Sequence, residues 1–229
     1  MKVKAVFLDF GGTLAYGGID WGDYHMAVRV LLASLGYNLD AASLKKAVGA
    51  ALLELQRHRS KGLEKTHEEF YRKVLRKVGI LADDDTLKMI LDTFKNYYVS
   101  TFYPCTEEVL KKLSESYRLV LISNTMSNQP REMLEKTGMD NLFELIICSM
   151  DLGIRKPNPA IFKYALDKLG VCSSETVHVG DNVEADMEGA SNSGITPIWI
   201  RTSDQGYWPG QAISNICDLP QFLETIQEA

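Results

Sequence analysis

Five residues with reactive or ligating side chains lie at the ends of short apolar runs or near the starts of predicted helices: Asp9, Ser123, Lys156, Asp181 and Asp186. In a single crevice the three negative charges of the carboxylates would exceed the one positive charge of the lysine. Such a cluster requires either a divalent cation or carboxyl groups with raised pKa values. Ligand sets made only of oxygen favour Mg²⁺, which proteins hold through one or two carboxylates together with substrate phosphate oxygens. The set therefore predicts phosphoryl chemistry with Mg²⁺ as the cofactor.

Each of these residues has an expected role in such chemistry. Asp9 would attack phosphorus, because an aspartyl-phosphate is a known type of covalent intermediate. Lys156 and the cation would neutralise the phosphoryl group, while the Ser123 hydroxyl and nearby backbone N–H groups would hold the phosphoryl oxygens. A small phosphorylated molecule is the expected substrate.

The elements that must position these residues alternate along the chain. Short apolar runs typical of buried strands occupy residues 3–8, 118–123, 145–148, 176–179 and 197–200. Helical patterns lie at residues 106–115, 130–137, 158–169, 184–193 and 218–227. Such alternation predicts a parallel sheet with right-handed crossovers. Because ligands of these sheets bind beyond the carboxyl ends of the strands, the five residues are expected to meet in one crevice.

The segment between residues 20 and 98 has a different pattern. It contains four sets of apolar residues at helical spacing, with no proline and almost no run rich in β-forming residues. This pattern predicts four helices in a separate all-α unit. The predicted fold class is therefore α/β: a doubly wound, Rossmann-like parallel-sheet core at residues 1–16 and 101–229, with an α-helical domain inserted at residues 17–100.

The order and spacing of the five residues resemble the four motifs of the haloacid dehalogenase superfamily, subfamily I. Residues 9–14 resemble motif one, Ser123 motif two and Lys156 motif three, and Gly180 and Asp181 through Asp186 resemble motif four. The inserted helices resemble the C1 cap domain of that family. The resemblance covers essentially the whole chain.

This resemblance implies a site residue by residue. Its expected catalytic residues are Asp9, Ser123 and Lys156, and its substrate-binding residues are Thr13, Ser123, Asn124 and Lys156. The implied metal ligands are Asp9, the backbone carbonyl of Gly11, Asp181 and Asp186, where Asp186 supports either the metal or the lysine.

One position departs from the family pattern. Most phosphatases of the family carry a second aspartate two residues after the nucleophile, and it protonates the leaving group. Gly11 stands there in this chain. The carbonyl of Gly11 can still bind a metal, but a general acid that contributes about 10²–10⁴ in rate is absent. This absence affects alkoxide leaving groups most.

Gly11 keeps alternatives to a phosphatase open. Phosphonoacetaldehyde hydrolases of the family lack the acid and keep the metal, but they need a cap lysine, for which Lys45, Lys46, Lys61 and Lys65 are available. Dehalogenases also lack the acid, but they need no metal and usually lose the motif-four aspartates, which this chain retains. We interpret the chain as a Mg²⁺-dependent phosphatase. A phosphonatase-like or 2-haloacid dehalogenase-like hydrolase and a non-catalytic binding or regulatory protein are the alternatives.

Composition and charge argue against several classes of partner and location. The formal net charge of -5 and the absence of a basic stripe give little support to nucleic-acid binding. No apolar run is long enough to span a membrane, and the first residues do not read as a signal peptide. The four cysteines are widely spaced, which predicts free buried thiols rather than disulfides or zinc ligands. We expect a cytoplasmic protein, monomeric or homodimeric.

Two further features are expected to be structural. His178 lies inside an apolar run, which predicts a core histidine. Trp21, Tyr24 and His25 begin the inserted domain, and packing between the two domains is their expected role.

Overall fold

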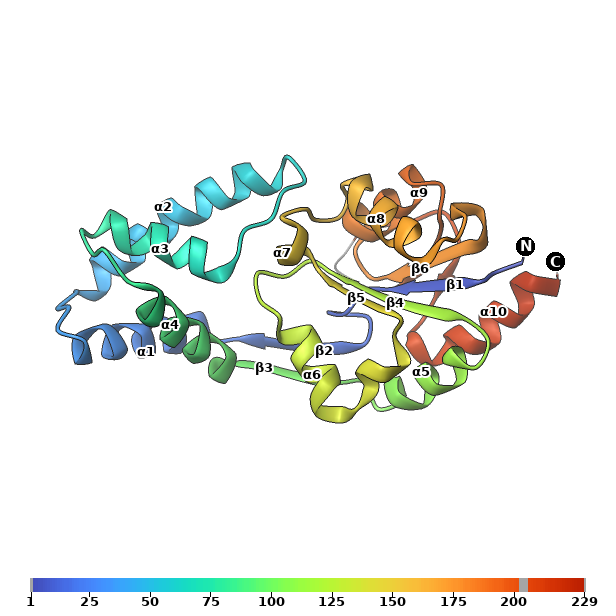
Figure 1. Ribbon diagram of the computed structural model, residues 1–229, viewed down its shortest axis with the longest axis horizontal. Helices are drawn as coiled ribbons and strands as arrows, with labels where there is room; N and C mark the ends of the chain where they lie inside the picture. Colours follow the sequence, from blue (N-terminus) through green and yellow to red (C-terminus); the bar gives the residue numbers. More distant parts are fainter. Residues whose placement is uncertain (1, 202–205, 229) are drawn as a thin grey trace. The chain divides into compact units, whose positions relative to one another are not determined.

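The computed structural model describes residues 2–201 and 206–228 and contains two compact units (Figure 1). One unit comprises Met1–Tyr16 and Thr101–Ala229, and the other comprises Gly17–Ser100. The first is an α/β unit and the second is largely helical, so each is described separately.

The α/β unit is built on a six-stranded sheet whose strands run parallel. Its strands are β1 (Ala5–Leu8), β4 (Arg118–Ser123), β5 (Leu145–Cys148), β6 (Thr176–Gly180), β7 (Thr196–Ile200) and β8 (Ala212–Ile213). They are arranged in the order β5-β4-β1-β6-β7-β8. The predicted α/β class with a doubly wound parallel sheet is confirmed. Because β1 lies between β4 and β6, the residues that follow these three strands are neighbours.

Helices connect the strands of this unit. They are α5 (Thr106–Ser114), α6 (Gln129–Thr137), α7 (Ser149–Leu152), α8 (Pro159–Leu169), α9 (Gly189–Asn192) and α10 (Leu219–Glu228), with 3-10 turns at Met139–Leu142, Ser173–Glu175 and Ile216–Asp218. The helix predicted at residues 184–193 is a π-helix, Val183–Glu188, followed by α9. The carbonyl of Asn182 accepts from the N–H groups of both Asp186 (2.9 Å) and Met187 (3.3 Å), which widens this turn.

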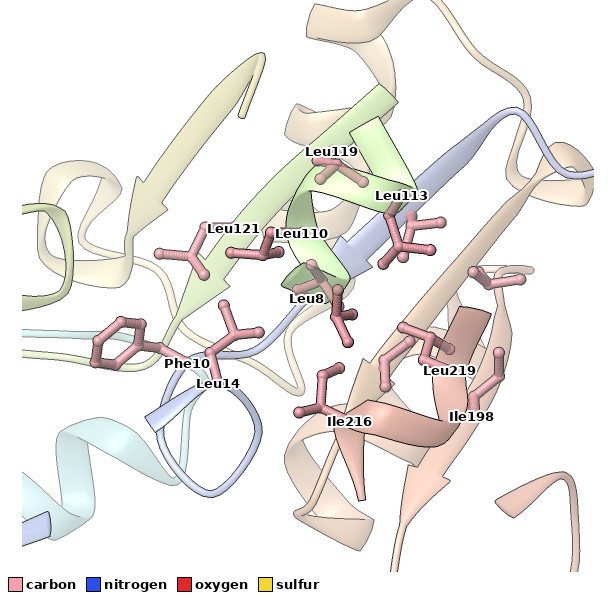
Figure 2. Packing of buried hydrophobic residues seen from close by; sticks show 14 of the residues in the cluster. Leu8, Phe10, Leu14, Leu110, Leu113, Leu119, Leu121, Ile198, Ile216 and Leu219 are labelled. Carbon is pink, nitrogen blue, oxygen red and sulfur yellow. The ribbon is translucent and has the colours of Figure 1, made fainter. Parts of the chain in front are cut away.

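Apolar side chains cover both faces of the sheet because successive residues of a strand point to opposite faces. On one face Leu8, Leu121 and Val179 belong to a cluster that α5 and α10 complete (Figure 2). On the other face Phe7 and Ile122 pack with residues of α8 and α9. Burial on both faces explains why the sequence of each central strand is a nearly continuous apolar run.

The helical unit has its own core. Its helices are α1 (Trp21–Ser34), α2 (Ala41–Arg59), α3 (His67–Lys77) and α4 (Asp84–Tyr97). Each begins after an Asp or Thr whose side chain accepts from the first turn, and the helices bury Val28, Leu44, Leu75 and Ile90 against one another. Tyr24 is fully buried in this unit, where its hydroxyl lies 3.0 Å from Nε2 of His67. None of the helices in the described residues is long and apolar enough to cross a bilayer.

The segments that join the two units pair with each other, a feature the sequence did not predict. They form a two-stranded sheet of β2 (Ala15–Ile19) and β3 (Tyr98–Phe102). A Cβ on Gly17 would overlap the backbone of Val99 and Ser100, so only glycine allows this close approach.

The prediction of free, buried cysteines was wrong for three of the four residues. Cys105 and Cys217 form a disulfide with a Cα–Cα distance of 5.8 Å, and the Cys172 thiol is free but exposed. Only Cys148 is a free buried thiol, and burial raises its pKa to about 11. The fold brings the start of α5 beside the turn that precedes α10, although 112 residues separate the two cysteines. The expectation of a reducing compartment rested on free thiols, and this disulfide removes that basis.

Candidate active site

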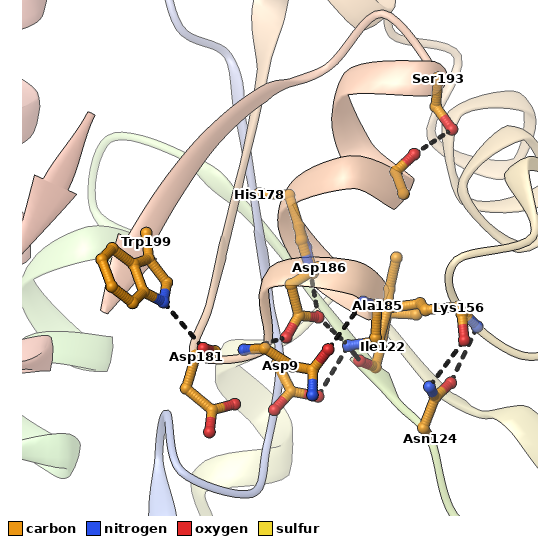
Figure 3. Close-up of polar contacts among 12 residues, drawn as sticks. Asp9, Ile122, Asn124, Lys156, His178, Asp181, Ala185, Asp186, Ser193 and Trp199 are labelled. Carbon is orange, nitrogen blue, oxygen red and sulfur yellow. Dashed lines mark hydrogen bonds and ion pairs between the residues drawn. The ribbon is translucent and has the colours of Figure 1, made fainter. Parts of the chain in front are cut away.

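The carboxyl ends of three adjacent strands bring together the residues predicted to act together (Figure 3). Asp9 follows β1, Ser123 ends β4 and Asp181 follows β6. The backbone N–H of Asp9 donates to the Val179 carbonyl (2.9 Å), which continues the β1–β6 pairing by one residue. This bond fixes the Asp9 backbone at the edge of the sheet.

Lys156 is the centre of the cluster and is almost completely buried, with 1% of its surface exposed. Its Nζ lies 2.7 Å from Oδ1 of Asp9, 2.6 Å from Oδ1 of Asp186 and 2.6 Å from the carbonyl oxygen of Ile122. A lysine ammonium has three donors, so all of them are used. Burial alone would lower the pKa of Lys156, but Asp186 and Asp9 outweigh burial and raise it. The lysine is therefore a fixed positive charge.

Asn124 holds the backbone of Lys156. Its Nδ2 donates to the Lys156 carbonyl (2.9 Å) and its Oδ1 accepts from the Lys156 N–H (2.9 Å). Asn124 was predicted to bind substrate, yet its amide group makes these two bonds within the chain. The observed role of Asn124 is therefore to position the backbone of Lys156.

The three carboxylates could bind a cation. Asp9, Asp181 and Asp186 each offer an oxygen, and these oxygens lie within 4.8 Å of one another. Burial raises the pKa of Asp9 to about 7 despite the attraction of Lys156. Burial, together with the charge of Asp186, raises the pKa of Asp181 to about 6. Two carboxyl groups that resist ionisation beside each other fit a divalent cation, which would stabilise their charged forms.

Asp186 differs from the other two carboxylates. Its Oδ1 lies 2.9 Å from Nε2 of His178 as well as 2.6 Å from Lys156, and its Oδ2 accepts from the Asn182 N–H (3.1 Å). Burial would raise the pKa of Asp186, but Lys156 and His178 hold it well below its usual range. Its contacts make Asp186 a partner of the lysine first, whereas the Asp181 carboxylate makes no ion pair in the described part of the chain.

The loop after Asp9 contains two glycines with different constraints. Gly12 has φ +75°, and a Cβ there would overlap the Asp181 carboxylate, so only glycine fits. Gly11 lies outside the left-handed region and an added Cβ would meet no atom within 4 Å. The buried Thr13 hydroxyl has no hydrogen-bond partner among the described residues. The hydroxyl of Ser123, which is 5% exposed, likewise has none there. Both hydroxyls can therefore bind a ligand.

The comparison with known proteins identifies the family. The profile of the haloacid dehalogenase-like hydrolases matches residues 42–200. The chain belongs to this family. The resemblance of its motifs to that family is thereby confirmed.

Curated haloacid dehalogenase-like relatives include several phosphatases. The chain is 31% identical to the pyrimidine 5'-nucleotidase YjjG of Escherichia coli over 130 residues, which is 55% of this chain and 58% of the relative. It is 29% identical to the glyceraldehyde 3-phosphate phosphatase of Methanopyrus kandleri over 162 residues, 68% of this chain and 67% of the relative. The matches thus span about half to two thirds of the relatives' lengths.

Solved structures of the family share the fold. A 2-haloacid dehalogenase from Pseudomonas syringae is 24% identical, with a TM-score of 0.72 over 97% of this chain and 99% of its own. A HAD phosphatase from Thermococcus onnurineus is 22% identical, with a TM-score of 0.64 over 96% of this chain and 98% of its own. Phosphatases and dehalogenases therefore both have this fold, so the fold alone does not distinguish the two reactions.

Two residues of this haloacid dehalogenase-like site escaped the sequence analysis. His178 is fully buried, as predicted for a core histidine, but the prediction missed that its Nε2 bonds to Asp186; burial lowers the pKa of its ring. Trp199 donates from Nε1 to the Asp181 carbonyl (2.8 Å). For His178, the one sequence feature that could have indicated a role in the site was a polar ring within an apolar strand. The sequence around Trp199 contained no such feature.

Proposed function

We propose that this chain is a Mg²⁺-dependent phosphatase that acts on a small phosphorylated metabolite through an aspartyl-phosphate at Asp9. The observation that carries this proposal is the buried Lys156 ammonium, 2.7 Å from Asp9, beside three carboxylate oxygens within 4.8 Å of one another. The phosphatase names of curated relatives support the same reaction class. The residues 17–100 would serve as the cap that selects the substrate, and the protein would act as a monomer or homodimer.

The protein groups have separate tasks in the proposed reaction. A carboxylate oxygen of Asp9 attacks phosphorus, and the bond between phosphorus and the leaving oxygen breaks with its electron pair on that oxygen. Lys156 balances the charge of the phosphoryl group, while the free hydroxyls of Thr13 and Ser123 donate to its oxygens. Water then attacks phosphorus, and the bond between phosphorus and the Asp9 oxygen breaks with its electron pair on the restored carboxylate. Inorganic phosphate leaves, and a proton of the water balances the charge of the leaving oxygen released in the first step.

The Asp9 and Asp181 carboxylates and the Gly11 carbonyl would hold Mg²⁺. When bound, Mg²⁺ withdraws charge from the phosphoryl oxygens and keeps both carboxyl groups ionised at neutral pH. The raised pKa values of Asp9 and Asp181 support such a site, because without a cation these groups retain protons. Trp199 fixes the Asp181 backbone and Gly12 makes room for the Asp181 carboxylate.

Gly11 favours leaving groups that need no proton. No carboxyl group is present where most family phosphatases keep their acid, so acyl and aryl phosphates should react faster than alkyl phosphates. The same observation favours a second candidate, hydrolysis of a C–P or C–halogen bond. The two aspartates of motif four weigh against a metal-free dehalogenase, and the intact Asp9–Lys156 contact weighs against a non-catalytic protein.

Turnover of p-nitrophenyl phosphate tests the proposal, because its phenolate leaves without a general acid. We expect Mg²⁺-dependent release of p-nitrophenol by the wild type. Asp9→Asn, which keeps the shape of the side chain and removes the nucleophile, is the matched control and should reduce turnover by several orders of magnitude. Folded wild-type protein that hydrolyses a 2-haloacid but no phosphate ester would establish the second candidate.

A further inference from the structure

The aspartate that contacts the catalytic lysine is itself held by a buried histidine. His178 is fully buried in β6, and its ring meets the Phe162 ring edge-on at a centroid distance of 5.1 Å. Its Nε2 lies 2.9 Å from Oδ1 of Asp186 (Figure 3). An ionised carboxylate can only accept, so Nε2 carries the proton and donates it. Packing alone would not require this donor, because an apolar side chain avoids the cost of burying a polar ring.

The same strand also makes the space that Asp186 occupies. Gly180 lies two residues after His178 in β6, so both face the same side of the sheet. A Cβ on Gly180 would overlap the Asp186 side chain. The Asp186 side chain thus occupies the space beside Gly180. Its Oδ1 is bonded to Nε2 of His178, and its Oδ2 accepts from the Asn182 N–H at 3.1 Å. Three neighbours determine its position independently of the lysine.

The position of Asp186 determines that of Lys156. The two donors His178 and Lys156 share Oδ1, the same oxygen that stands 2.6 Å from Nζ. Nζ of Lys156 also donates to Oδ1 of Asp9 at 2.7 Å and to the Ile122 carbonyl at 2.6 Å. If Asp186 lost its anchor and rotated away from this position, Nζ would follow its charge and leave Asp9, since opposite charges attract strongly in this buried site.

We propose that His178 is a positioning residue of this hydrolase: its Nε2–H anchors Asp186 so that Lys156 stays beside Asp9. This inference rests on the proposed function. In this proposal His178 acts through Asp186, to which its Nε2 is bonded, and is not itself a catalytic residue. Loss of a hydrogen bond from a residue that supports an active-site residue typically lowers activity by about 10–100-fold.

Two substitutions isolate the hydrogen bond from the packing. His178→Gln keeps a nitrogen donor at the same number of bonds from Cβ as Nε2. His178→Met has a similar reach but ends in a methyl group. The donor is the principal difference between the two variants, and methionine adapts well to a site beside an aromatic ring.

Turnover gives the first readout. With p-nitrophenyl phosphate, His178→Met should lower kcat about 10–100-fold while KM stays within about 3-fold. His178→Gln should keep kcat within about 3-fold of the wild type. The melting temperature of His178→Met should not fall below that of His178→Gln, because its buried group is apolar. Equal kcat for the two variants, or a loss that follows the melting temperature, would overturn the proposal.

A second readout needs no turnover and so separates this proposal from the proposed function. In protein labelled with ¹⁵N-lysine, the Nζ protons of Lys156 should exchange slowly, because all three meet acceptors within 2.7 Å. The signal is assigned by its loss in Lys156→Met. We expect faster exchange in His178→Met and unchanged exchange in His178→Gln. Unchanged exchange in both variants overturns the positioning role, whereas a wild type without phosphatase turnover overturns only the proposed function.

Discussion

Replacing Gly11 with aspartate tests the proposed chemistry where this chain departs from its family. Gly11 is exposed, its φ lies outside the left-handed region, and an added Cβ meets no atom within 4 Å. A Cβ can therefore be added at this position without a clash. Gly12 offers the opposite case, since its φ of +75° and the Asp181 carboxylate leave no room for a Cβ. Gly12→Ala should thus disturb the site, although the change is smaller.

The size of the gain can be bounded. A positioned general acid contributes about 10²–10⁴ in rate, which is about 3–5 kcal/mol of barrier at 1.36 kcal/mol for each factor of ten. An exposed aspartate has an ordinary pKa of about 3.9, so roughly one molecule in a thousand carries the proton at pH 7. The negative charges of Asp9 and Asp181 nearby would raise that pKa and the protonated fraction. We therefore expect a gain of at most about 100-fold, which increases toward pH 5.

A series of phosphate monoesters with leaving groups of increasing basicity provides the assay. The wild-type rate should fall steeply along the series, and Gly11→Asp should flatten the slope by accelerating the alkyl esters alone. Gly11→Ala is the matched control and should leave the slope steep. A flat wild-type slope would refute the reasoning, because another group would then protonate the leaving oxygen. Tyr103, whose pKa is raised by burial and by Asp181, would be the first residue to replace by phenylalanine.

Three further predictions concern the metal, pH and the disulfide. EDTA should abolish turnover and Mg²⁺ should restore it, whereas full turnover in chelator would contradict the metal site formed by Asp9 and Asp181. In EDTA the pKa values of Asp9 and Asp181 are about 7 and 6 in the folded protein, whereas both aspartates have the ordinary pKa of 3.8 in the unfolded chain. Between these pH values the folded protein keeps protons that the unfolded chain has lost. The melting temperature in EDTA should therefore fall as pH rises from about 4 to 7, and Mg²⁺ should cancel this fall; a melting temperature that rises over that window would show that the groups are not perturbed as described. The Cys105–Cys217 disulfide closes a loop of 112 residues, so a Cys105→Ser/Cys217→Ser variant should lose about 2–5 kcal/mol of unfolding free energy. Urea unfolding with and without reductant measures that loss, and a wild type insensitive to reductant would contradict it.

The sheet and the place of the candidate site could be predicted because local patterns determine them. Residues buried on both faces of a parallel sheet must be apolar, so β1, β4 and β6 are visible as continuous apolar runs. The polar residues that follow these runs then lie at one edge of the sheet. Asp9, Ser123 and Asp181 were therefore expected to meet, although Asp9 and Asp181 are 172 positions apart in the sequence.

Contacts between elements could not be predicted in the same way. The disulfide depends on how α5 packs beside the turn before α10, and no local pattern encodes that distance. Asn124 could be seen after a strand, but its two bonds to the Lys156 backbone depend on a loop 32 residues away. His178 resembled a core residue because its partner Asp186 lies on the following turn, where a π-helix carries it back toward the strand.

The donor count of Lys156 has a consequence for the proposed reaction. Asp9, Asp186 and the Ile122 carbonyl already use its three N–H groups, so a phosphoryl oxygen can receive a bond only if one acceptor is released. Asp186 keeps its charge and the carbonyl stays an acceptor throughout, but Asp9 loses its carboxylate charge when it becomes an acyl phosphate. The attack itself therefore weakens the Asp9–Lys156 bond and frees one donor as charge develops on the phosphoryl group. Asp9→Asn removes the same charge without reaction, so faster exchange of the Lys156 Nζ protons in that variant is expected, and unchanged exchange would show that the lysine does not depend on Asp9.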